Sequence, residues 1–233
     1  MRSATLARAA RRCVCLLALL GSLPAPAAGL DALTSKDAAG GLRAALSQGI
    51  DRAVSQLGAA DGFLGNPKVA IPLPPALART DSALRLLGMG GDADALQAAM
   101  NHAAETAVAA AGPTFKKALR SMTVTDAKQV LTGGEDAGTQ YFRRTSADEL
   151  KAKFRPIVAH ATARLELASL YNRYAGKAAE LGLIRASDAD INEYVTGRAL
   201  DGLFSVIADE ERAIRQDPLG QGSALIKKVF GVL

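Results

Sequence analysis

The side chains best suited to chemistry gather in one short polar stretch. Residues 132–145 read Thr-Gly-Gly-Glu-Asp-Ala-Gly-Thr-Gln-Tyr-Phe-Arg-Arg-Thr, which places hydroxyls, carboxylates, an amide, a phenol and two arginines together. Three glycines let this backbone turn sharply or approach a ligand closely, and adjacent arginines can pair with a carboxylate or a phosphate. The ligand-binding candidates are Asp136, Thr139, Gln140, Tyr141, Arg143 and Arg144.

Two interpretations of this stretch stay open. In the first, a helix that starts at Ser146 adds backbone N–H donors to the arginines and completes an anion site. In the second, the stretch is a tight connection between two helices, in which Asp136, Thr139 and Arg143 satisfy one another and the helix ends. The sequence alone does not separate a site from a connection.

A second charged cluster lies near the end of the chain. It contains Asp209, Glu210 and Glu211, followed by Arg212 and Arg215. Because Glu211 and Arg215 are four residues apart on a predicted helix, we expect an ordinary ion pair on a solvated face.

Asp201 is a carboxylate inside an otherwise apolar stretch. It must reach solvent or find a buried partner such as an arginine, and a structural ion pair is the expectation rather than a general base.

Metal and cofactor chemistry find little support in the sequence. The two histidines, His102 and His160, have no partner at ligand spacing, so no metal site is expected. Sequence motifs of serine hydrolases, nucleotide phosphate loops and dinucleotide-binding folds do not occur. We therefore expect no cofactor, and the catalytic residues, if there are any, remain unknown.

The N-terminus has the pattern of an export signal. Arginines precede an apolar run of 11 residues, 13–23, and small residues follow around Ala25 and Ala27. A membrane-spanning helix needs about 18 apolar residues or more, so we expect a signal peptide over residues 1–27, cleaved near Ala27. Both cysteines lie within it, which predicts a mature chain without thiols.

Charge gives no support for binding to nucleic acid. Of the 28 Lys and Arg residues, four lie in residues 1–27, and the remaining 24 nearly balance 23 Asp and Glu residues. The basic character of the chain therefore comes mostly from the signal, whereas nucleic-acid binding requires a basic stripe on the folded domain.

Composition and hydrophobic periodicity predict an all-α fold. Alanine and leucine are abundant, aromatic residues make up 4% of the chain, and no stretch alternates like a strand. About 200 residues suffice to bury the core of one domain without disulfides. We expect residues 28–233 to form a single-domain multi-helix bundle.

The first helix is predicted from Thr34 to Gly58, because its leucines and isoleucine recur every three or four residues. Residues 61–75 follow with four prolines and two glycines, which exclude a helix. Alternating Val69, Ile71 and Leu73 indicate an ordered loop packed against the helices rather than a flexible linker. Such long loops are often functional, although simple packing is the alternative.

Helix start and stop signals divide the rest of the chain. Ser146 and Glu149 form a predicted capping box for a long helix with a kink at Pro156, preceded by a polar segment of about one turn. The predicted helices cover residues 75–87, 92–111, 126–131, 146–174, 190–216 and 224–230, and another short helix starts at Pro113 and carries Phe115 and Leu119. Asp92 and Thr123 or Thr125 are the expected caps, and residues 176–186 are an expected break.

Four segments together resemble a known bacterial family. They are Gly-Phe-Leu-Gly-Asn-Pro-Lys-Val-Ala-Ile-Pro-Leu-Pro (62–74), residues 126–145, Tyr-Val-Thr-Gly-Arg-Ala-Leu-Asp-Gly-Leu-Phe (194–204) and Ile-Arg-Gln-Asp-Pro (214–218). The family is catalogued as domain-of-unknown-function family 4197, and the similarity spans residues 30–233. The resemblance implies an exported helical protein of Gram-negative bacteria, without an assigned activity. Some relatives resemble lipoproteins, but this chain has no cysteine at the expected cleavage point.

Two functional hypotheses follow. The first is a non-catalytic periplasmic binding or protein-interaction module, in which helices enclose an apolar groove with residues 132–145 at its mouth. Its partner would be an apolar or anionic small molecule or an envelope protein, with no stable membrane insertion. The second is a metal-independent enzyme in which Asp136, Tyr141 and the two arginines act on an anionic substrate. The sequence does not distinguish the first from a purely structural envelope protein.

Overall fold

Helices make up nearly all the regular structure of the chain. The computed structural model describes residues 35–86, 90–180, 182, 185 and 189–217, and these contain no strand. The predicted all-α, multi-helix fold is confirmed. The helices are α1 (Ser35–Leu57), α2 (Pro75–Leu86), α3 (Gly90–Ala109), α4 (Gly112–Ser121), α5 (Val124–Leu131), α6 (Ala137–Thr162), α7 (Glu166–Glu180) and α9 (Ile191–Gln216).

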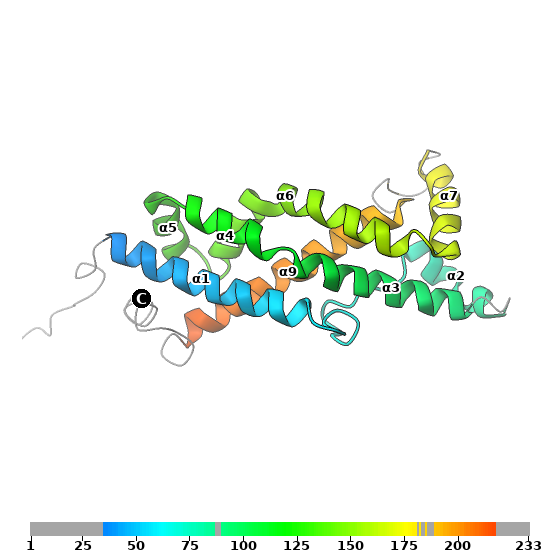
Figure 1. The fold of residues 1–233 in the computed structure, drawn as a ribbon, viewed down its shortest axis with the longest axis horizontal. Coiled ribbons are helices and arrows are strands. Elements are labelled where there is room, and N and C mark those ends of the chain that lie inside the picture. Colours follow the sequence, from blue (N-terminus) through cyan, green and yellow to red (C-terminus); the bar gives the residue numbers. More distant parts are fainter. Residues whose placement is uncertain (1–34, 87–89, 181, 183–184, 186–188, 218–233) are drawn as a thin grey trace, which may run out of the picture.

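The four long helices define an elongated bundle. Figure 1 shows α1, α3, α6 and α9 running along the long axis, with α4 and α5 at one end and α2 and α7 at the other. Helix α9 packs against α1, α3 and α6, so it is the central element. This agrees with the sequence around residues 199–208, which is apolar nearly all round, as expected of a central helix.

Aromatic and alanine side chains share the core. The Phe115 ring meets Phe142 and Phe204 edge-on, with ring centroids 5.5 Å and 6.1 Å apart. On α3, small side chains such as Ala103, Ala104 and Ala107 are fully buried. Short side chains allow helix backbones to approach closely, which explains how a chain with few aromatic residues fills its interior.

The proline-rich loop is ordered and packed, as its sequence predicted. Phe63, Val69, Ile71 and Leu73 are buried in the core. Two polar side chains of α3 bind its backbone: the Glu105 carboxylate accepts the N–H groups of Phe63 and Leu64 at 3.0 and 3.2 Å. The Asn101 amide pairs with both the N–H and the C=O of Ile71 at 2.8 and 2.9 Å.

Asn101 and Glu105 therefore hold the loop in place, although the loop itself forms no helix or strand. Both side chains are buried, and both form hydrogen bonds with backbone groups of the loop; the Asn101 amide also donates to the Gln97 carbonyl of α3. The packing alternative that the sequence left open is thus sufficient to account for the loop.

Several helix boundaries differ from the predictions. Helix α6 begins at Ala137, nine residues before Ser146, and the predicted capping box is wrong because Ser146 lies buried within the helix. The predicted long helix is also interrupted between Thr162 and Glu166, where neither a glycine nor a proline marks the interruption. The Thr162 hydroxyl bonds to Asn192 at 2.6 Å, which ties the end of α6 to α9.

Other boundaries are close to the predictions. Helix α3 begins at Gly90, so Asp92 lies in its first turn. Thr123 caps α5 through a capping box with Asp126. Helix α7 continues through Gly176 to Glu180, which shortens the predicted break. The signal peptide, residue 87 at the end of the helix predicted over 75–87, and the predicted helix over 224–230 lie outside the described residues.

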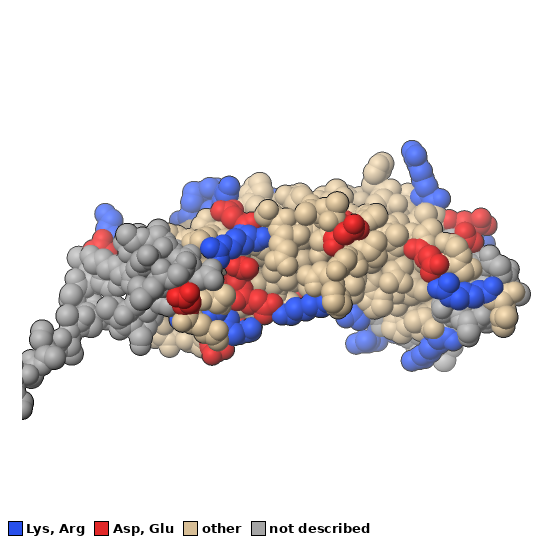
Figure 2. All heavy atoms as spheres, turned by 90° about the horizontal axis from the view of Figure 1, so that it is seen from below, with Lys and Arg blue, Asp and Glu red and all other residues tan. Residues whose placement is uncertain are grey.

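Charged residues are unevenly distributed along the bundle. In Figure 2, Lys, Arg, Asp and Glu gather toward the two ends of the visible face, and its middle is sparsely charged. Among the described residues, no helix combines the length and the apolar character needed to cross a membrane.

Candidate functional site

The six candidate residues lie at the start of α6, in its N-cap and its first two turns. Because successive residues of a helix point about 100° apart, their side chains fan out around the axis. Asp136 is the N-cap residue, but its side chain makes no capping bond and accepts a hydrogen bond from the Gln140 amide at 2.9 Å. This Asp136–Gln140 pair lies at the surface of the molecule, where Gln140 is exposed.

Thr139 and Tyr141 point inward and are used by the fold. The hydroxyl of Thr139 donates to the Glu211 carboxylate at 2.9 Å. The Tyr141 hydroxyl donates to the carbonyl of Ala118 on α4 at 3.0 Å, and burial raises the pKa of this phenol. Neither hydroxyl is available as a catalytic group in this arrangement.

The two arginines contact different helices. The Arg143 guanidinium lies 4.6 Å from the ring centroid of Phe204 and donates to Asp201 at 3.3 Å, so it faces α9. Arg144 lies on the side of α5, where its charge contributes to lowering the pKa of Asp126, although hydrogen bonds from Thr123 are the main cause. A bidentate anion clamp by this pair is not formed.

Asp201 reaches solvent, which is the first of the two alternatives expected for it, and its arginine partner is not buried. Its side chain is 66% exposed and reaches solvent, and it also pairs with an arginine, Arg143. Its exposure identifies a surface ion pair, which contributes little to stability.

The candidate residues therefore do not converge on one point. General acid–base catalysis needs its groups within hydrogen-bond reach of a common reacting atom. Here Asp136 binds Gln140, Tyr141 binds α4 and Arg143 binds α9. The start of α6 is thus a junction between helices rather than an open pocket.

Glu211 is the central residue of this junction, and sequence reasoning misplaced it. The predicted pair with Arg215 is confirmed at 2.8 Å, but the predicted solvated face is wrong, since the Glu211 side chain is only 5% exposed. The available signal was its spacing: Glu211 follows Ile207 by four residues and precedes Ile214 by three, so all three share the buried face of α9.

The Glu211 carboxylate fills the anion site at the start of α6. It accepts the backbone N–H groups of Gly138 and Thr139 at 2.9 and 2.8 Å, in addition to the Thr139 hydroxyl. Backbone donors at a helix N-terminus attract negative charge, and here a carboxylate of the chain itself supplies it. Arg215 balances that charge and also donates to the Val130 carbonyl at 2.9 Å.

Space beside Glu211 is too small for a ligand. Side chains including Leu42, Leu46, Ile207 and Ile214 enclose an apolar void of about 10 Å³. A single water needs at least that volume together with polar partners. The apolar groove that the sequence placed behind residues 132–145 is not present at this position.

The described histidines and carboxylates do not form a metal site. His102 and His160 are both exposed, and the Nε2 atom of His102 lies 3.8 Å from the Asp61 carboxylate. Within the described ranges, no three His, Cys, Asp or Glu side chains come together to hold a metal ion.

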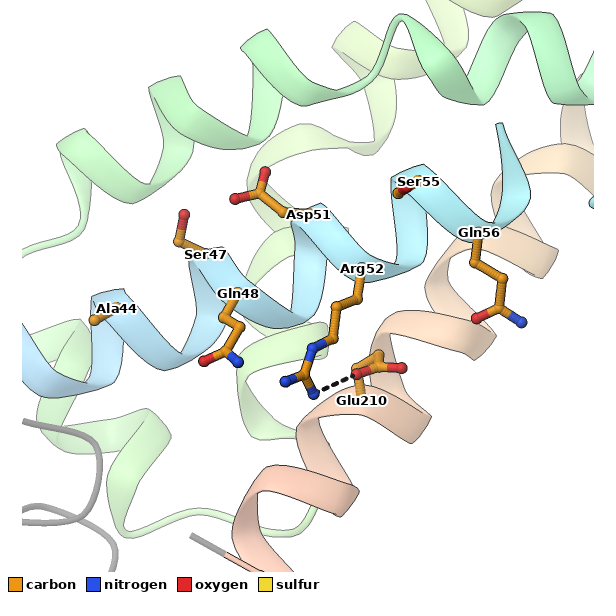
Figure 3. Close-up of a pocket in the computed structure, with 8 residues that line it drawn as sticks. All are labelled: Ala44, Ser47, Gln48, Asp51, Arg52, Ser55, Gln56 and Glu210. Atoms are coloured by element: carbon orange, nitrogen blue, oxygen red, sulfur yellow. Dashed lines mark hydrogen bonds and ion pairs between the residues drawn. The ribbon is translucent and has the colours of Figure 1, made fainter. Parts of the chain in front are cut away.

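A large concave surface lies along α1. It is shallow and widely open to solvent, and we call it the α1 groove. Figure 3 shows Gln48 and Arg52 on the side toward α9, where Arg52 pairs with Glu210 at 3.4 Å, whereas Ser47 and Asp51 point to the other side. The lining residues are Ala44, Ser47, Gln48, Asp51, Arg52, Ser55, Gln56 and Glu210.

The α1 groove follows one face of a helix. Its α1 residues recur at intervals of three and four from Ala44 to Gln56, which is the spacing of a single helical stripe. Hydroxyls, amides, a guanidinium and carboxylates alternate along it. Asp51 is exposed, and its carboxylate forms no ion pair with the described residues. Sequence reasoning missed this stripe because a polar helical face normally indicates only solvation.

The fold and these contacts define a class: an all-α helical bundle whose described buried polar residues serve mainly internal contacts, with an open concave surface along α1 that is lined mostly by polar residues. A family model described as "Protein of unknown function (DUF4197)" matches residues 32–231, so the chain belongs to this family, and the resemblance seen in the sequence is confirmed. No curated protein and no solved structure matches the chain.

Proposed function

We propose that this chain is a non-catalytic interaction protein of the bacterial periplasm, and that it binds an extended polar segment of a partner protein in the α1 groove. The observation that carries the proposal is the groove itself: a long, open stripe of hydrogen-bonding side chains on one helix, with Glu210 of α9 along one side. An open polar surface suits a macromolecular partner, whereas small molecules are usually bound in concave, mostly apolar pockets.

The dispersion of the candidate residues supports binding over catalysis. The hydroxyls of Thr139 and Tyr141 and the carboxylate of Glu211 are all engaged inside the fold. A metal-independent enzyme built on residues 132–145 would need these groups to face a common substrate. No contact among the described residues favours that alternative.

The periplasmic location rests on the N-terminal sequence. Arginines, an 11-residue apolar run and small residues around Ala27 form the pattern of a cleaved export signal. N-terminal sequencing of the protein from a periplasmic extract tests this location. A new N-terminus near Ala28 is expected, and an intact Met1 in the cytoplasmic fraction would contradict it.

Site-specific photocrosslinking in the native host tests the groove. A photoreactive residue at Ser55 or Gln56, both exposed in the α1 groove, should yield one discrete adduct with the same partner. Ala95 on α3 and Ala152 on α6 are exposed outside the groove and serve as control positions.

The pattern of adducts decides the outcome. The same partner captured from both groove positions and from neither control supports the proposal, and Asp51→Lys should then weaken the capture by reversing a charge in the groove. The groove is not the binding surface if the controls capture the same protein equally well, or if Ser55 and Gln56 capture none. Native mass spectrometry of the gently isolated protein checks whether a stable complex already exists.

A further inference from the structure

Helix α4 is strongly amphipathic and carries charge of one sign only. Its sequence Gly-Pro-Thr-Phe-Lys-Lys-Ala-Leu-Arg-Ser contains Lys116, Lys117 and Arg120 and no acidic residue. Phe115 and Leu119 are buried against the bundle, so the three cations fall on the exposed side. This face belongs neither to the start of α6 nor to the α1 groove.

A fourth cation, Lys153 of α6, joins this face through the carboxylate of Glu149. Glu149 accepts hydrogen bonds from Lys117 at 2.8 Å and from Lys153 at 2.9 Å, and Thr114 bonds to both Glu149 and Lys153. The hydrogen bond from Lys117, followed by those from Lys153 and Thr114, lowers the pKa of Glu149 to about 2. The ionised carboxylate therefore holds two ammonium groups at the surface, with exposed fractions of 69% for Lys117 and 43% for Lys153.

The α4 basic face is defined here as Lys116, Lys117, Arg120 and Lys153. Lys116 and Arg120 are exposed and form no ion pair with any described residue. The nearest acidic residues in the sequence of α6 are Glu149, within the cluster, and the exposed Asp148 before it. The face therefore keeps a positive charge, although the chain beyond residue 27 is almost neutral.

An exposed aliphatic side chain follows α4 in the sequence. Val124, the first residue of α5, is 48% exposed, and Leu86 on α2 is the other large hydrophobic residue exposed in the described part of the chain. A cluster of exposed Lys and Arg side chains is typical of proteins that bind anionic lipid headgroups. Such a face matches an array of phosphates better than a single small anion, because its cations spread along the helix.

We propose that the α4 basic face binds the anionic headgroups of a phospholipid bilayer, so that the bundle lies on a membrane surface without inserting a helix. Lys and Arg side chains near an anionic membrane each add to the affinity, and the attraction falls off within a Debye length. This binding is separate from partner binding in the α1 groove, which lies on other residues.

Vesicle co-sedimentation tests the proposal with the chain purified from its host. Vesicles of phosphatidylcholine mixed with phosphatidylglycerol should retain the protein at low ionic strength and release it at high ionic strength, and pure phosphatidylcholine vesicles should not retain it. The double substitution Lys116→Gln/Arg120→Gln should lower the partition coefficient about 30-fold, since it removes two cations.

A charge-matched control distinguishes the face from net charge. Arg164→Gln/Arg173→Gln removes two exposed cations that form no ion pair with described residues, and it should leave the partition coefficient nearly unchanged. Circular dichroism verifies that both variants are folded.

Three results would overturn the proposal. These are equal binding to neutral vesicles, equal losses in the two double variants, and retention by a soluble polyanion such as polyphosphate but not by anionic vesicles. None of these depends on the crosslinking result at Ser55 and Gln56, so the two proposals fail separately.

Discussion

Glu211 and Glu149 form the same local motif in two different settings. Each lies on a helix four residues before a cation, Arg215 or Lys153, and each accepts several hydrogen bonds. Glu211 is 5% exposed and binds the backbone of another helix, whereas Glu149 is 34% exposed and binds a hydroxyl and flexible ammonium groups.

The difference shows that burial, rather than the pairing motif, determines what a carboxylate does. A buried ion pair that loses one partner leaves an uncompensated charge, which is strongly destabilising. An exposed pair is screened by water and contributes little. The pair on α9 is therefore expected to hold the fold together, and the pair on α6 to organise a surface.

The largest expected effect is that of removing the buried carboxylate. Glu211→Leu removes the buried carboxylate that balances the charge of Arg215, and it leaves the N–H groups of Gly138 and Thr139 without their acceptor. We expect a loss of about 3–5 kcal/mol in the free energy of unfolding, measured by urea denaturation. A loss no larger than that of Glu149→Leu would remove the distinction between the two carboxylates.

The next effect concerns Glu105, a second buried carboxylate that binds backbone groups. Glu105→Ala leaves the N–H groups of Phe63 and Leu64 unsatisfied and should cost about 1–3 kcal/mol. Hydrogen exchange should increase in the proline-rich loop and remain unchanged at the start of α6. Equal increases in both regions would indicate global loosening instead of a local anchor.

The space around two helical glycines, Gly138 at the start of α6 and Gly197 on α9, gives a third comparison. A Cβ at Gly138 would lie 2.5 Å from Cδ2 of Leu46 and 3.0 Å from Oε1 of Glu211, so Gly138→Ala should destabilise by about 1–3 kcal/mol through overpacking. Gly197 on α9 has open space around its Cβ position, and Gly197→Ala should stabilise by about 0.5–1 kcal/mol. Thermal unfolding should show a lower melting temperature for Gly138→Ala and a higher one for Gly197→Ala. Equal changes in melting temperature would contradict the close approach at Gly138.

The smallest effect is expected at the surface cluster and depends on pH. Because the folded-state pKa of Glu149 lies at about 2, below its ordinary value of 4.5, its contribution to stability is present above pH 4.5 and lost as the pH falls toward 2. The melting temperatures of the wild-type chain and Glu149→Gln should therefore differ slightly at neutral pH and converge in acid. A difference that grows on acidification would have the wrong sign.

The fold was largely predictable because most of its signals are local. The stripe of apolar residues in α1, Thr123 before α5, Pro113 in the first turn of α4 and Asp190 before α9 each mark a helix within a few neighbouring residues. The same reasoning failed at Ser146, whose capping signal lies inside a longer helix.

The candidate site was less predictable because its side chains belong to different contacts. Residues 136–144 look like one polar group in the sequence, but α6 directs Tyr141 to α4 and Arg143 to α9. In the sequence, the groove residues of α1 are an ordinary polar stripe. The surface becomes concave only where Glu210 of α9 lies beside that stripe.

The sequence by itself determined the all-α class, most helix boundaries, the packed proline-rich loop and the family. Those features depend on periodicity, caps and turn residues, which act over a few residues. Only the tertiary structure decided where α6 begins and which carboxylate is buried. Glu211 supplies the acceptors for the first turn of α6 from 73 residues away, and no local signal can reveal such a cap, because it exists only once α9 has packed against α6.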